Sequence, residues 1–107
     1  MIPKFEIVRE RPQFTRKKST VIIDVSKYTE IKLINANEVC SNPKFNYAIA
    51  LPLFGGATFF YPHEINNLKF YLNEKEVKFP TDSIERLYVE LYKLLHIEYL
   101  KALVDEL

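Results

Sequence analysis

The feature that most constrains the fold is the periodicity of residues 82–107. No Gly or Pro interrupts this segment, and apolar side chains recur in its first half at spacings of three and four, which places them on one helical face. These are Ile84, Leu87, Tyr88, Leu91, Leu94 and Leu95. Pro80 ends the preceding extended run, and either Thr81 or Asp82 can cap the helix, with Glu85 near the positive end of the helix dipole. The sequence therefore predicts one long C-terminal helix with a core-facing stripe.

After Leu95 the apolar pattern moves to another face of this helix. The members of the second stripe are Ile97, Leu100, Leu103, Val104 and Leu107. This stripe lies roughly 160° around the helix from the first, so one flat core cannot bury both. Asp105 and Glu106 place negative charge at the negative end of the dipole, where an unsupported last turn frays. We expect a partner to cover the second stripe; the alternative is a turn near His96 that folds the second half back over the same core.

Composition limits the class of protein. The chain has 107 residues, 48% of them hydrophobic, which suffices for one core and one domain over residues 1–107. A single cysteine, Cys40, excludes a disulfide within the chain and fits a reducing compartment. No apolar run approaches the roughly 18 residues of a membrane span, and no secretory signal pattern opens the sequence. We therefore expect a cytoplasmic protein without membrane contact.

The first part of the chain predicts strands. Residues 4–9 alternate, residues 20–25 are β-branched and apolar, and residues 30–34 alternate again, which are strand patterns. We expect the second and third of these strands to pair as a hairpin through a turn at residues 26–29. Residues 35–42 are polar and predict no regular element.

Two further hairpins follow. Gly55 and Gly56, the only glycines, stand between two apolar runs, the arrangement of a two-residue hairpin turn in which Leu51 faces Phe60. Both faces of this hairpin are apolar, so we expect both to be covered. Residues 68–79 predict the last hairpin, with its turn at Asn73 and Glu74 and with Phe70 opposite Val77. The predicted fold is α+β: an antiparallel meander of about six or seven short strands followed by one long C-terminal helix.

No set of side chains predicts catalysis or the binding of a metal or cofactor. The candidate nucleophile and base are Cys40 with His63 or His96, oriented by Asp24 or Glu64, and no elbow or glycine-rich turn supports them. The two histidines lack the spacing of metal ligands. Gly55 and Gly56 are not followed by the Lys and helix of a phosphate-binding loop. We expect a protein that is not an enzyme.

Residues 9–18 form a basic segment with three of the four arginines in the chain. Its basic and aromatic side chains are Arg9, Arg11, Phe14, Arg16, Lys17 and Lys18. Positive charge beside a ring that stacks is typical of contacts with single-stranded nucleic acid. A solvated loop is often this basic, however, and the pI of about 7.8 lacks the excess common in nucleic-acid-binding domains. We expect an exposed loop or arm here.

Two functional hypotheses follow. In the first, the chain is a small interaction protein that forms a homodimer through the second stripe, Ile97, Leu100, Leu103, Val104 and Leu107, or that uses this stripe as an adaptor or inhibitor on another protein. If exposed, these side chains form an apolar surface on the order of several hundred Å², the size that marks interaction sites. In the alternative hypothesis, the basic segment 9–18 binds nucleic acid.

Overall fold

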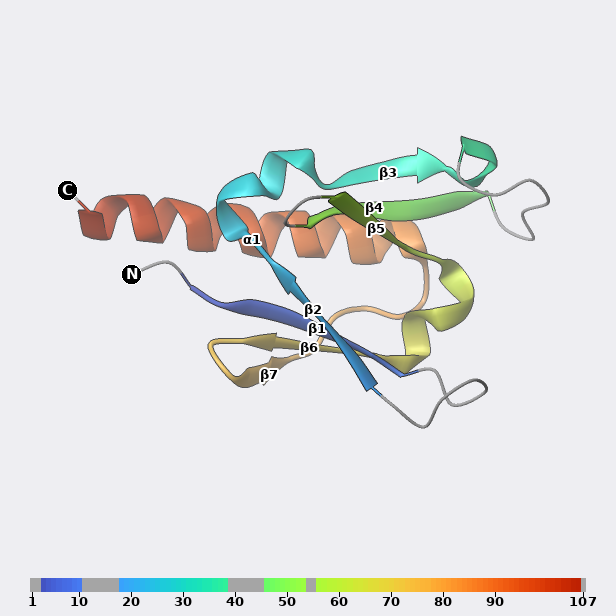
Figure 1. Ribbon diagram of the computed structural model, residues 1–107, viewed down its shortest axis with the longest axis horizontal. Coiled ribbons are helices and arrows are strands. Elements are labelled where there is room, and N and C mark those ends of the chain that lie inside the picture. The colour runs from blue at the N-terminus through green and yellow to red at the C-terminus, as the bar shows by residue number, and fades with distance from the viewer. Residues whose placement is uncertain (1–2, 11–17, 39–45, 54–55, 107) are drawn as a thin grey trace.

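Seven strands, three 3-10 helices and one long α-helix form the described part of the chain (Figure 1). The computed structural model describes residues 3–10, 18–38, 46–53 and 56–106. Its strands are β1 (Phe5–Glu10), β2 (Lys18–Ile23), β3 (Lys32–Asn35), β4 (Tyr47–Leu53), β5 (Gly56–Phe60), β6 (Leu68–Leu72) and β7 (Lys75–Val77). The helices are the 3-10 helices η1 (Val25–Glu30), η2 (Ala36–Glu38) and η3 (Pro62–Asn67) and the α-helix α1 (Ile84–Glu106). The predicted α+β class, with strands followed by one C-terminal helix, is confirmed.

The strands of the predicted antiparallel meander form two separate antiparallel sheets. The first has the order β2-β1-β6-β7 and the second the order β3-β4-β5. Because β1 lies inside the first sheet, Phe5 faces Ile23 on one side and Leu72 on the other. Phe5 and Ile7 point to the same side of the strand and are fully buried, as alternation along a half-buried strand requires.

The predicted hairpin between residues 20–25 and 30–34 is wrong. β2 pairs with β1 instead, and the intervening residues form η1, which leads the chain into the second sheet. Asp24 caps η1: its Oδ1 accepts hydrogen bonds from the backbone N of Ser26 at 3.0 Å and from the Ser26 hydroxyl at 2.6 Å. Such local side-chain bonds offer the backbone an alternative to a strand ladder. Residues 25–30 therefore form a short 3-10 helix where the sequence predicted a turn.

The central hairpin has the predicted faces but a different register. The structure pairs Ile49 with Phe60, Leu51 with Thr58 and Leu53 with Gly56, so the predicted pairing of Leu51 with Phe60 is wrong by two residues. A shift by two leaves every side chain on its expected face, because side chains alternate with a period of two. The observed register places two large buried side chains, Ile49 and Phe60, opposite each other.

The last hairpin is formed as predicted, with Phe70 opposite Val77 in the β6–β7 ladder. Its turn residues Asn73 and Glu74 have φ values of 50° and 71°, the left-handed conformation of a two-residue primed turn. Asn73 also holds the start of β1: its Oδ1 accepts from the backbone N of Lys4 at 2.9 Å, and its own N donates to the Lys4 carbonyl at 2.8 Å. The turn is thereby joined to a neighbouring strand.

The helix α1 runs without a break through His96, so the alternative of a turn there is wrong and the prediction of one continuous rod is confirmed. Its 23 residues span about 34 Å. The predicted caps, Thr81 and Asp82, are also corrected. Ser83 directly precedes the helix, and its hydroxyl accepts from the backbone N of Arg86 at 3.1 Å, the hydrogen bond of an N-cap. Asp82 instead binds the Arg86 side chain at 2.9 Å, an interaction that lowers the pKa of Asp82.

One core joins both sheets to the first half of α1. The largest fully buried side chains come from all three parts and include Phe5, Ile7, Ile23, Ile49, Leu51, Phe60, Leu87, Leu91 and Leu95. Because Leu87, Leu91 and Leu95 are buried, the predicted core-facing role of the first stripe is confirmed. Complete burial of each Leu contributes about 1.5–3 kcal/mol to stability. Figure 1 shows that the C-terminal end of α1 projects beyond the ends of the sheets.

Candidate interaction surface

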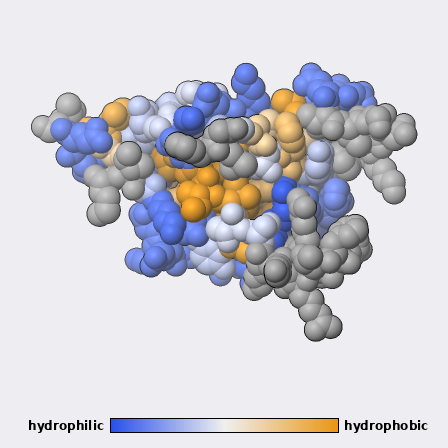
Figure 2. Space-filling view, in the orientation of Figure 1, coloured by the Kyte–Doolittle hydropathy of each residue, from blue (hydrophilic) through white to orange (hydrophobic). Residues whose placement is uncertain are grey.

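The second stripe of α1 is exposed. Ile97, Leu100, Leu103 and Val104 have 49%, 45%, 39% and 66% of their surface accessible, respectively. We call these four residues the C-terminal stripe; Leu107, the fifth residue that the sequence assigned to it, lies outside the described residues. In Figure 2, apolar surface lies among hydrophilic side chains at the end of the molecule where the last turns of α1 project.

Beside the C-terminal stripe, α1 is packed against η1. Tyr28 of η1 contacts three rings of α1, with centroid distances of 5.4 Å to Tyr92, 4.8 Å to His96 and 5.4 Å to Tyr99. Ala102, one turn further along, is buried. We call Tyr28, Tyr92, His96 and Tyr99 the aromatic cluster. Because this cluster anchors η1 to the second half of α1, the helix is held in place and the C-terminal stripe points away from the core.

A shallow groove of about 320 Å³ lies on the C-terminal stripe. Ile97, Leu100 and Val104 form its apolar part, and Lys101 and Asp105 form its edge. Lys101 is 3.4 Å from Glu98, so its charge is balanced within the same helix. A groove of this composition suits an apolar side chain from another surface, with polar groups around it.

The two ends of the C-terminal stripe differ in charge. Lys93 lies one turn before Ile97, has an exposed side chain and is 3.5 Å from Glu90. Asp105 and Glu106 lie at the other end, where the last turn contains no basic residue and the helix dipole is negative. A surface that covers the stripe therefore meets the ion pair of Lys93 with Glu90 at one end and acidic groups at the other.

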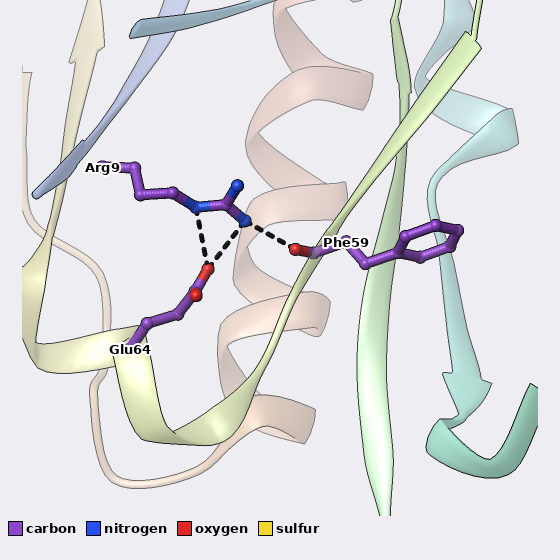
Figure 3. A network of polar contacts seen from close by, with 3 residues as sticks. All are labelled: Arg9, Phe59 and Glu64. Carbon is purple, nitrogen blue, oxygen red and sulfur yellow. Dashed lines mark hydrogen bonds and ion pairs between the residues drawn. The ribbon is translucent and has the colours of Figure 1, made fainter. Parts of the chain in front are cut away.

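Arg9, which the sequence assigned to an exposed basic segment, is buried, with 6% of its surface accessible. Its Nε and Nη2 donate to Glu64 Oε1 at 3.0 and 2.8 Å, and Nη2 also donates to the Phe59 carbonyl at 2.5 Å (Figure 3). The guanidinium carbon lies 4.3 Å from the centre of the Phe60 ring. Arg9 follows Phe5 and Ile7 on the inner face of β1, and this alternation was the sequence signal for its burial. The expected role of Arg9 in phosphate contact is therefore corrected.

The remainder of the predicted basic segment is only partly described. Arg11, Phe14, Arg16 and Lys17 lie outside the described residues. Lys18 begins β2 and pairs with Glu10 of β1. The predicted loop over residues 9–18 is therefore too long at both ends, because residues 9 and 10 belong to β1 and residue 18 belongs to β2. Nucleic-acid binding by this segment stays a prediction.

The histidines that the sequence singled out lie in separate places. His96 belongs to the aromatic cluster, and its Nδ1 is buried without a hydrogen-bond partner among the described residues. His63 is exposed and stacks on Tyr61 at 5.8 Å, and Cys40 lies outside the described residues. In the described parts of the chain, no three His, Cys, Asp or Glu side chains are arranged to hold a metal ion, and no helix is long and apolar enough to span a membrane.

Ile22 is an exposed apolar residue that sequence reasoning did not single out. It has 58% of its surface accessible and lies on β2, opposite Glu6. Isolated apolar side chains are common on protein surfaces, whereas the C-terminal stripe gathers four on one helix face. The stripe is therefore the stronger candidate for an interaction surface.

No protein-family model, curated protein or solved structure matches the chain.

Proposed function

We propose that this chain is a small interaction protein that forms a homodimer through the C-terminal stripe of α1. The observation that carries the proposal is the joint exposure of Ile97, Leu100, Leu103 and Val104 on a helix end that the aromatic cluster holds in place. A fixed apolar face loses little conformational entropy when it is covered. The same face can act on another protein, which makes an adaptor or inhibitor the second form of this proposal.

The energetics limit any such dimer to weak, reversible association. Full burial of a Leu or Ile side chain contributes about 1.5–3 kcal/mol, and each residue of the stripe has roughly half of that burial left to gain. Covering both stripes in a dimer then contributes on the order of 6–12 kcal/mol, against an association cost of about 4–15 kcal/mol. At the favourable ends of both ranges the balance corresponds to a dissociation constant of about 1 μM, and a smaller gain or a larger cost gives a weaker dimer. The dimer should therefore dissociate on dilution.

Light scattering over a concentration series tests the proposal. The unmodified chain, with a monomer mass of 12.7 kDa, should approach twice this mass at high micromolar concentration. Leu100→Glu together with Leu103→Glu should give a folded monomer at every concentration, because both side chains are exposed in the single chain. Val89→Glu is the matched control, since Val89 is 44% exposed on the same helix but lies outside the stripe.

Three results decide between the forms of this proposal. Dimers of the unmodified chain and of Val89→Glu, with a monomeric double variant, support the homodimer. A monomer at all concentrations, with α1 intact by circular dichroism, contradicts the homodimer and leaves only the form in which another protein covers the stripe. A dimer that survives the double substitution places the interface elsewhere on the molecule.

A further inference from the structure

The sequence spacing of the exposed residues of α1 indicates which kind of surface can pack against them. Lys93, Ile97, Leu100 and Val104 follow one another at intervals of four, three and four, the seam along which two helices pack side by side. Ile and Val alternate with Leu in this seam, and all three are exposed. A second α1 offers the matching seam, so a second copy of this chain is the occupant that the pattern favours.

The relative direction of the two helices follows from charge. In a parallel pair, each residue lies level with its own copy. The two C-terminal ends, each with Asp105, Glu106 and the negative end of a dipole, then lie side by side and repel each other, whereas Glu90 balances the charge of Lys93 in each copy. In an antiparallel pair, Lys93 lies near the acidic end of the other helix, and the dipoles oppose each other. The antiparallel arrangement therefore separates the two acidic ends and removes the repulsion that a parallel pair would have.

We infer that the dimer pairs its two α1 helices antiparallel, with the twofold axis near Leu100. This inference rests on the proposed homodimer and specifies its geometry. At a rise of about 1.5 Å per residue, Lys93 lies about 10 Å from the axis, and Asp105 of the second copy lies about 8 Å from the axis on the same side. The two residues are thus almost level. Lys101 lies close to the axis, but Glu98 balances its charge in each copy.

The control position in the proposed dimer agrees with this geometry. Val89 lies 11 residues before Leu100, or about 16 Å along the helix, whereas the described part of the second helix ends six residues after Leu100, at Glu106. Val89 therefore stays outside the overlap of the two helices. The N-terminal half of each α1 remains free of the partner in this arrangement.

Charge reversal tests the direction of pairing. Lys93→Glu places like charges together at both ends of an antiparallel seam, so the dimer should weaken about tenfold. Adding Asp105→Lys and Glu106→Lys to the same chain restores opposite charges and should recover most of the affinity. In a parallel pair, Lys93→Glu also weakens the dimer, because acidic side chains at positions 90 and 93 then lie beside their copies, but the two lysine substitutions bring no recovery. Failure of these substitutions to recover the affinity overturns the inference.

A distance measurement gives an independent answer. A spin label at Arg86→Cys, in a Cys40→Ser background, lies 14 residues from Leu100 in each chain, so antiparallel helices separate the two labels by about 42 Å along the axis. Parallel helices hold them within about 20 Å, because packed helices lie 8–10 Å apart. A dimer with the short distance overturns the antiparallel inference and leaves the homodimer intact. A monomeric unmodified chain overturns both.

Discussion

The buried ion pair between Arg9 and Glu64 gives a sharp test of how the two sheets are joined. Arg9 lies on β1 of the first sheet, and it bonds both Glu64 of η3 and the carbonyl of Phe59 on β5 of the second sheet. The accessible fractions of the Arg9 and Glu64 side chains are 7% and 15%. Removing Glu64 leaves a buried guanidinium without its counter-charge, and breaking such a pair costs about 3–5 kcal/mol. We expect Glu64→Ala to lower the free energy of unfolding by that amount.

A double substitution separates the cost of the uncompensated charge from the loss of packing. Arg9→Met combined with Glu64→Leu removes both charges and keeps apolar volume, so the double variant should lie within about 1–2 kcal/mol of the unmodified chain. Glu76→Ala is the control, because Glu76 also pairs with a basic side chain, Lys78 at 2.7 Å, but at an exposed site. Urea denaturation followed by circular dichroism measures all three variants. Equal stability of Glu64→Ala and Glu76→Ala would refute the reasoning.

Three further expectations concern other parts of the chain. Leu91→Ala should lower the free energy of unfolding by about 2–5 kcal/mol, whereas Lys93→Ala on the outer face should be nearly neutral; equal effects in urea denaturation would show that the two faces are misassigned. Glu74→Gly should stabilise the last hairpin by about 0.5–1 kcal/mol, because glycine adopts a positive φ freely, and an equal gain in Glu74→Ala would contradict that cause. If the basic segment binds nucleic acid, changing the basic residues 16–18 to Ala should flatten the salt dependence of oligonucleotide retention, and an unchanged slope removes this hypothesis.

Local patterns of sequence predicted the elements that depend on short-range periodicity. The core face of α1 around Leu91 and its exposed face around Leu100 both follow from a 3.6-residue repeat over an uninterrupted segment. The last hairpin followed from alternation on both sides of Asn73. In each case the hydrophobic pattern, the turn or capping residues and the observed burial agree with one another, and such agreement allows the structure of a segment to be predicted from its sequence.

The sequence mispredicted features that depend on contacts between distant segments, such as which strands pair and in which register. β2 has the apolar composition that a pairing with β3 would need, but it pairs with β1 along its whole length, and η1, capped by Asp24, carries the chain away from β2 before β3 begins. The two-residue error in the central hairpin changed no face, so hydrophobic pattern alone could not detect it. Arg9 was assigned to the basic segment by its neighbours in sequence, whereas its burial depends on Glu64, 55 residues away.

Amide hydrogen exchange of the unmodified chain at two concentrations tests the central claim most directly, because it locates the interface as well as detecting it. At a concentration well above the dissociation constant, amides of residues 97–106 should exchange slowly, and dilution below it should accelerate their exchange. Amides around Leu87, in the half of α1 that the core protects, should be unaffected. Protection of residues 97–106 that does not change with concentration, or concentration-dependent protection elsewhere in the chain, would contradict the assignment of the C-terminal stripe as the dimer interface.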